Sequence, residues 1–258
     1  MLSFALAFDE RRLRADKMTK SSYRSVDETK IIETLKRLRN RIGERFPGSG
    51  LYHVSEELIA VARETSECVE YIRSPHWPIR IATGAAITGM VLAVLWVVIR
   101  TSRLPAGIGG QADAVQVIDA MASAAVFIGL AILFLLRIEP SLKRRQALRV
   151  VHQLRSLAHV IDMHQLTKDP ERLMSPEIPD TSSSPGRTMN ASQLGRYLDY
   201  CSELLSITSK LSALLVQYFN DPVLLGAVNE IETLTTGLSR KIWQKIELLD
   251  SGRIASGA

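Results

Sequence analysis

The side chains best suited to chemistry lie between residues 152 and 164, where three histidines and an aspartate share one predicted helix. His152 and His159 fall on the same helix face, but a rise of seven residues separates them by about 10 Å, too far for two ligands of one ion. His159 and Asp162 have a workable spacing, and His164 follows the polar face. A zinc ion would need two more ligands from elsewhere. We therefore predict solvated or hydrogen-bonded histidines, no metal site and no bound cofactor.

Two other short patterns also fail as sites. The glycine-rich stretch at 105–111 lacks the Gly-Lys-Ser/Thr ending and the preceding strand of a phosphate-binding loop. Asn190-Ala-Ser192 matches a glycosylation acceptor, which is a short pattern with many chance matches. No nucleophile stands beside a base, and no two carboxylates have catalytic spacing. The sequence therefore nominates no catalytic residue and favours a protein that is not an enzyme, without excluding catalysis.

Charge and cysteine usage narrow the class of protein further. The chain has 258 residues and a net charge of +5, but the excess is spread thinly, and no polycationic patch predicts nucleic acid as a partner. Cys68 and Cys201 each fall on the apolar face of a predicted helix. We expect both to be reduced thiols in a protein core.

The elements that position these residues are dominated by two apolar runs. Residues 81–99 lie between Arg80 and Arg100, and residues 120–136 lie between Asp119 and Arg137. As helices they would measure roughly 28 Å and 26 Å, close to the thickness of a hydrocarbon core. We predict transmembrane helices at 79–100 and 115–138, so that the lipid bilayer is one partner of the chain.

Basic residues indicate the orientation of this hairpin. Arg73 and Arg80 precede the first span and five cationic side chains follow the second within residues 137–149, whereas the opposite side has only Arg100, at the end of the first span, and Arg103 in the loop 101–114. Cationic residues are retained on the cytoplasmic side. We expect both termini in the cytoplasm and the short loop outside. The first residues do not resemble a signal peptide, and the short loops favour a bacterial inner membrane.

Polar and small residues within the spans leave two interpretations open. Asp119 stands at the mouth of the second span, where a carboxylate either reaches water or marks an ion pathway. Small residues recur four apart, as in Ala85 with Gly89 and Ala125 with Gly129. This spacing fits close packing of one span on the other, and it fits contacts between copies equally well.

Outside the spans the chain repeats amphipathic helical patterns. Ser25 and Glu28 have capping-box spacing, and they precede a stripe formed by Ile31, Leu35, Leu38 and Ile42. A second stripe comprises Leu51, Val54, Leu58, Val61, Thr65, Cys68 and Ile72. The first helix is rich in basic residues and the second in acidic ones, so we predict an antiparallel pair with ionic contacts along its flanks.

The C-terminal part has the same character. Tyr197, Cys201, Leu204, Thr208, Leu211, Leu215 and Tyr218 form one coiled-coil stripe, and Leu224, Val228, Ile231, Thr235, Leu238 and Ile242 form another. Asp221 is the expected N-cap of the second helix, with Pro222 at its first position. The first helix carries few charges, which predicts a covering partner on another side. That partner is either the N-terminal hairpin of the same chain or a second protein, contacted through outer positions such as Leu214.

Together these patterns predict an all-α fold, a two-span transmembrane helical hairpin with cytoplasmic amphipathic helical hairpins. The expected segments are a flexible basic N-terminus 1–24, a helical hairpin 25–74, spans 79–100 and 115–138 around the loop 101–114, a helical extension 139–167, a Pro/Ser-rich linker 168–190, an antiparallel hairpin 191–250 and a flexible tail 251–258.

The favoured function is a membrane-anchored helical interaction or scaffold protein. It would present cytoplasmic helices to a protein partner, or self-associate, through residues 191–250. The alternative is a homo-oligomeric channel or transporter subunit, with Thr83, Thr88, Gln116, Asp119 and Ser123 as pore-lining candidates. With two spans and a large helical portion beside them, the chain resembles divalent-cation channels. The resemblance is limited to architecture, because the Gly-Met-Asn or Asp-Ile-Met-Glu loops of those families are missing.

Overall fold

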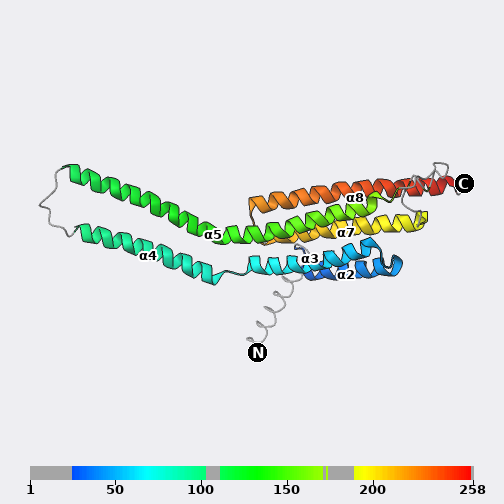
Figure 1. Ribbon diagram of the computed structural model, residues 1–258, viewed down its shortest axis with the longest axis horizontal. Helices are drawn as coiled ribbons and strands as arrows, with labels where there is room; N and C mark the ends of the chain where they lie inside the picture. Colours follow the sequence, from blue (N-terminus) through cyan, green and yellow to red (C-terminus); the bar gives the residue numbers. More distant parts are fainter. Residues whose placement is uncertain (1–24, 103–110, 171–172, 174–188, 257–258) are drawn as a thin grey trace, which may run out of the picture. The chain divides into compact units, whose positions relative to one another are not determined.

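The computed structural model describes residues 25–102, 111–170, 173 and 189–256, and this part of the chain contains helices and no strand. The helices are α2 (Glu28–Arg45), α3 (Gly50–Arg73), α4 (Trp77–Ser102), α5 (Gln111–Leu166), α7 (Ala191–Gln217) and α8 (Pro222–Ser256) (Figure 1). The expected N-terminal segment 1–24 lies outside the described residues. So do residues 103–110 of the loop and most of the predicted linker.

The chain divides into two compact units. The hairpin unit comprises Ser74–Arg145, which holds α4 and the first part of α5. The helical unit comprises Met1–Arg73 and Gln146–Ala258, and its described helices are α2, α3, the remainder of α5, α7 and α8. The N-terminal and C-terminal hairpins therefore belong to one unit.

Helix α7 is the central helix of the helical unit. It contacts α2, α3 and α8, so the N-terminal hairpin of the same chain covers it. Almost every residue of the predicted stripes is buried, and Tyr218 is the exposed exception. Residues off the stripes are buried too, among them Leu205, Ile207, Ser212 and Leu214. This wide burial explains the low charge of α7, because a central helix has only a narrow strip that faces water.

Helix ends are closed by side chains that only partly match the sequence prediction. Asp221 caps α8 as expected, accepting from the backbone N–H of Val223 and Leu224 at 3.1 and 3.0 Å. The N-cap of α2 is Asp27 and not Ser25, because its carboxylate accepts from the backbone N–H of Thr29 and Lys30. A carboxylate also interacts favourably with the helix dipole.

The end of α5 is held by a side chain from another helix. Lys245 of α8 donates to the backbone carbonyls of Gln165 and Lys168 at 2.9 and 3.0 Å. The last carbonyls of a helix have no partner within that helix, so this ammonium supplies one. It thereby ties α8 to α5 inside the helical unit.

Two helices run beyond or through their expected boundaries. Helix α8 continues to Ser256, whereas the sequence analysis ended it at residue 250 and placed a flexible tail there. The Ser251 hydroxyl donates to the carbonyl of Leu248 within this stretch, and no proline interrupts it. Helix α5 joins the second apolar run to the predicted extension as one helix with Pro140 inside it. Because proline has no N–H, the carbonyl of Leu136 lacks its usual helical partner.

The hairpin unit exposes its largest apolar side chains. Exposed fractions reach 67% at Trp96, 73% at Phe127 and 70% at Phe134. The structure contains two helices long and apolar enough to cross a membrane by length and composition. A water-soluble protein rarely leaves so continuous an apolar surface uncovered.

The half-buried side chains of the hairpin unit are mostly of medium size. The half-buried positions are Ile79, Thr83, Ile87 and Met90 on α4 and Ile128, Ala131, Ile132 and Leu135 on α5. Ala85, Gly89 and Ala125 are exposed instead, and added Cβ atoms at Gly89 and Gly129 would meet nothing within 4 Å. The small residues therefore do not bring the two helices together within the hairpin, contrary to the first interpretation of their spacing.

Candidate functional site

The histidines singled out by the sequence lie on the helical unit without converging. His152 and His159 are exposed on α5. Asp162 accepts a hydrogen bond from the side chain of Gln165 at 2.6 Å, so its carboxylate is engaged within its own helix. His164 is half-buried against Gly50, and burial together with the nearby charge of Lys168 lowers its pKa. Among the described residues no three His, Cys, Asp or Glu side chains are grouped to hold a metal ion.

The two cysteines are buried and unpaired with each other, as expected. Burial raises the pKa of Cys68 to about 11 and that of Cys201 to about 12. Nucleophilic attack and metal binding require the thiolate. Both thiols are therefore chemically quiet at neutral pH in the folded protein.

The pore candidates of the channel alternative are scattered over the hairpin unit. Thr83 is half-buried, while Thr88, Asp119 and Ser123 are exposed. The side chain of Gln116 lies outside the described part of the structure. Two helices enclose no pore alone, so a pore would require several copies.

The most highly charged site in the hairpin unit surrounds Glu139, just beyond the apolar segments. Arg80 of α4 donates from Nε to Oε2 of Glu139 at 2.9 Å. Lys143 Nζ lies 3.1 Å from Oε1, and His76 Nδ1 lies 3.9 Å from the same oxygen. We call these four residues the Glu139 cluster.

The cluster also engages the backbone, because Lys143 donates to the carbonyl of Ser74 at 3.0 Å. The side chain of Glu139 is only 16% exposed and that of Lys143 only 10%. The hydrogen bond from Arg80 and the charge of Lys143 lower the pKa of Glu139 to about 2. The carboxylate therefore stays ionised at neutral pH and holds three cationic or protonatable groups. This geometry is suited to linking α4 to α5 and not to transferring a proton.

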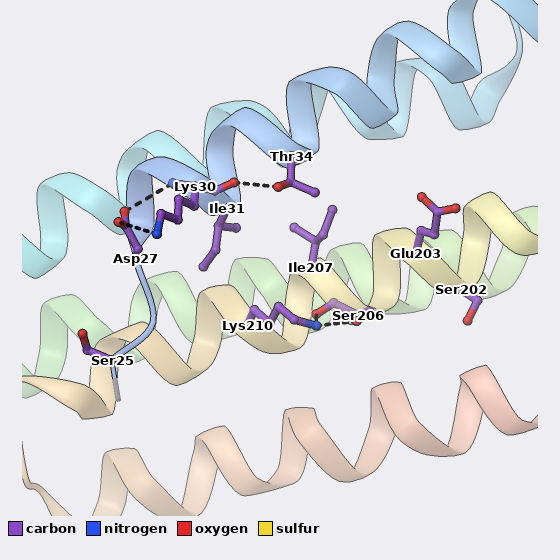
Figure 2. A pocket seen from close by; sticks show the side chains of 10 residues that line it. All are labelled: Ser25, Asp27, Lys30, Ile31, Thr34, Ser202, Glu203, Ser206, Ile207 and Lys210. Carbon is purple, nitrogen blue, oxygen red and sulfur yellow. Dashed lines mark hydrogen bonds and ion pairs between the residues drawn. The ribbon is translucent and has the colours of Figure 1, made fainter. Parts of the chain in front are cut away.

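A groove between α2 and α7 on the helical unit has a volume of about 710 Å³. Figure 2 shows Ile31 and Ile207 between the two helices, with polar side chains around them. The groove is lined by Ser25, Asp27, Lys30, Ile31, Thr34, Ser202, Glu203, Ser206, Ile207 and Lys210. We call it the α2–α7 groove.

The charged side chains of the α2–α7 groove already have protein partners. Asp27 caps α2 and lies 4.0 Å from Lys30. The Lys210 ammonium donates to the Ser206 hydroxyl at 2.6 Å (Figure 2). Glu203 receives two hydrogen bonds from the guanidinium of Arg41, at 3.2 and 3.4 Å. The Lys210 ammonium is a donor to the Ser206 hydroxyl and not a base for it, so this groove offers surface for recognition rather than an evident reaction.

A second hollow of about 500 Å³ adjoins the first at Ser206 and Lys210. It lies between α7 and α8, and we call it the α7–α8 groove. Its other lining residues are Ser209, Thr235, Thr236, Ser239, Arg240 and Trp243. Trp243 is 59% exposed, which is unusual for so large an apolar side chain.

Sequence reasoning missed the Glu139 cluster and both grooves. A local signal existed for part of the cluster, since Glu139 and Lys143 have the i, i+4 spacing of a helical ion pair. The partnership with Arg80 joins residues 59 apart, and no periodicity along one helix predicts it.

Comparison of the chain with protein-family models, with curated proteins and with solved structures finds no match.

Proposed function

We propose that this protein is a membrane-anchored helical scaffold. The hairpin unit inserts in a bilayer as two transmembrane helices, and the helical unit stands in the cytoplasm and binds a protein partner. The single observation that carries the proposal is the contrast in burial between the two units. Leu92, Phe127 and Phe134 are more than half exposed in the hairpin unit, while the helical unit encloses a continuous apolar core of its own.

Lipid is the environment that best accounts for the exposed apolar surface. The helices of the hairpin unit satisfy most of their backbone hydrogen bonds internally, as a bilayer requires, and the carbonyl of Leu136, which loses its partner to Pro140, lies at the end of the second span. Trp77, near the cytoplasmic ends proposed for the spans, is 65% exposed, and indole side chains favour the interface between hydrocarbon and water. The Glu139 cluster lies at the same ends, where its charges reach polar headgroups.

The outer side of α8 and the adjoining α7–α8 groove are the best candidates for the partner surface. Helix α7 is covered on several sides, and the sequence-based choice of Leu214 as an outer position is wrong, because its exposed fraction is 1%. Trp243 instead presents a large apolar side chain beside a polar groove. Exposed tryptophan beside arginine is typical of side chains that dominate binding energy in interfaces.

Charge indicates the chemistry of this partner. Lys210 and Arg240 are exposed and line the α7–α8 groove together with Trp243. A partner segment with acidic side chains and one apolar pocket or ridge would match this surface. We therefore propose an acidic protein segment, docked along α8.

The test is site-specific photo-crosslinking in native membranes, with the crosslinking amino acid in place of Gln244 on the exposed side of α8. We expect one adduct of defined mass, lost when Trp243→Glu is added to the same chain. Val160→Glu is the matched control, because it places the same charge at another exposed apolar position of the helical unit. Unchanged crosslinking in the Trp243→Glu chain would remove the partner surface proposed here.

The channel alternative remains a proposal with its own test. The exposed small residues of the hairpin unit suit contacts between copies, and two spans enclose no pore alone. Mass determination in nanodiscs separates the two functions. A closed ring of identical chains would favour the channel, and Asp119→Asn would then be expected to alter ion flux.

A further inference from the structure

The hairpin unit carries a marked excess of cationic side chains at one end. Residues 74–80 and 137–145 contain the five cations Arg80, Arg137, Lys143, Arg144 and Arg145, against the single carboxylate Glu139. These residues directly follow or precede the apolar runs. The excess of positive charge is therefore concentrated at this end of the hairpin unit.

Two of the five cations pair with the same carboxylate. Arg80 and Lys143 share the carboxylate of Glu139 at 2.9 and 3.1 Å. Arg137 and Arg145 are exposed on α5, and neither has a hydrogen bond, an ion pair or a ring contact within the described protein. Their guanidinium groups are thus available to a ligand outside the chain.

The surroundings of Arg137 specify where such a ligand lies. Arg137 follows Leu136, which is 57% exposed, and Phe134, which is 70% exposed. A side chain directly beyond an exposed apolar segment lies at the depth of lipid headgroups. Arginine binds phosphate through two parallel N–H donors, and this geometry suits a phosphodiester.

We propose that this end of the hairpin unit binds the headgroups of anionic phospholipids through Arg137 and Arg145. The two residues are separated by about 12 Å along α5. They therefore hold separate lipid molecules, and Arg144 between them adds to the positive potential. The inference rests on the proposed insertion in a bilayer. It goes beyond that proposal by naming the lipid class and the residues that select it.

The experiment uses the full chain in nanodiscs made from equal amounts of phosphatidylcholine and phosphatidylglycerol. The lipids retained by the protein after release are identified by native mass spectrometry. We expect phosphatidylglycerol to be enriched over phosphatidylcholine. Each arginine at a membrane surface is worth a factor of about five in this preference, so Arg137→Gln with Arg145→Gln lowers it about twenty- to thirty-fold.

A matched control separates this site from general charge. Lys36→Gln with Arg63→Gln removes two exposed cations from α2 and α3 of the helical unit, and we expect the lipid preference to stay at the wild-type value. Added salt should lower the wild-type preference, because lipid charge is screened within a Debye length.

The outcomes distinguish failure of this inference from failure of the proposed function. A chain that does not enter nanodiscs at all contradicts membrane insertion. A chain that enters them but retains both lipids equally overturns the anionic-lipid site. So does an equal loss of preference in the control chain, since the site would then not lie at Arg137 and Arg145.

Discussion

Arg80 of α4 donates a hydrogen bond from Nε to Oε2 of Glu139 of α5 at 2.9 Å, which links two helices across 59 residues of sequence. The acceptor is shared with Lys143, whose ammonium also reaches the carbonyl of Ser74. A helical hairpin with medium-sized apolar contacts has little to fix its register. The Glu139 cluster supplies a directional contact at one end of the hairpin unit.

Loss of this carboxylate should loosen the hairpin unit. We expect Glu139→Gln to lower the unfolding free energy by about 1 kcal/mol, because Arg80 is half-exposed and its pair is partly screened. In a domain of the size of the hairpin unit that corresponds to a melting temperature about 4–8 °C lower in detergent. Glu33→Gln is the control, since its pair with Arg37 is exposed on both sides. An equal effect of the two variants would contradict the role given to Glu139.

Gly50 should tolerate no side chain. A Cβ atom there would clash with Cε1 of His164, so we expect Gly50→Ala to cost about 1–3 kcal/mol of stability. Adding His164→Ala should recover part of the loss. Gly226 in α8 faces open space, and Gly226→Ala should be neutral or stabilise by about 0.5–1 kcal/mol. Thermal unfolding in detergent measures all three.

The buried thiols should make the helical unit sensitive to alkali. Folding raises the pKa of Cys68 and Cys201 from 9.0 to about 11 and about 12. Above pH 9 the unfolded chain releases these protons while the folded chain retains them, so stability falls as the pH rises from about 9 to about 11. The Cys68→Ala, Cys201→Ala chain should lose less stability over that interval. If the unfolding free energy of the two chains falls with pH at the same rate, the thiols do not contribute to the alkaline loss of stability.

A charge at Leu214 should prevent folding rather than partner binding. This residue is 1% exposed on the central helix, and an unpaired buried carboxylate is among the most destabilising changes in a protein. We expect Leu214→Glu to cost about 4 kcal/mol or more. Trp243→Glu, at an exposed position, should leave the helical content and melting temperature unchanged. Circular dichroism of the two purified chains separates the cases.

The helices and most of their buried faces were predictable from the sequence. Apolar residues at alternating intervals of three and four placed Leu35, Leu58, Leu204 and Ile231 in the core, where the structure has them. Asp221 followed by Pro222 correctly predicted the start of α8. These features are local, because each depends on the spacing along one helix.

Features that depend on several helices were not predictable in the same way. Leu214 is buried because α2, α3 and α8 all contact α7, and the stripe of a single helix does not show how many neighbours cover it. The predicted ion pairs between α2 and α3 reduce to Arg39 with Glu56 among the described contacts. Arg41 pairs with Glu203 of α7 instead. Surface pairs depend on neighbouring helices whose positions the sequence pattern does not give.

The most direct test of membrane anchoring is thiol labelling in sealed right-side-out membrane vesicles with a membrane-impermeant maleimide. Cys68 and Cys201 are buried, so the natural chain provides a background of low reactivity. Two single variants are compared. Gly107→Cys lies in the sequence segment that joins the two apolar helices, and Gln244→Cys lies on the exposed side of α8. We predict that Gly107→Cys is labelled in intact vesicles and Gln244→Cys only after they are opened. Labelling of both positions from the same side would contradict a hairpin that crosses the membrane.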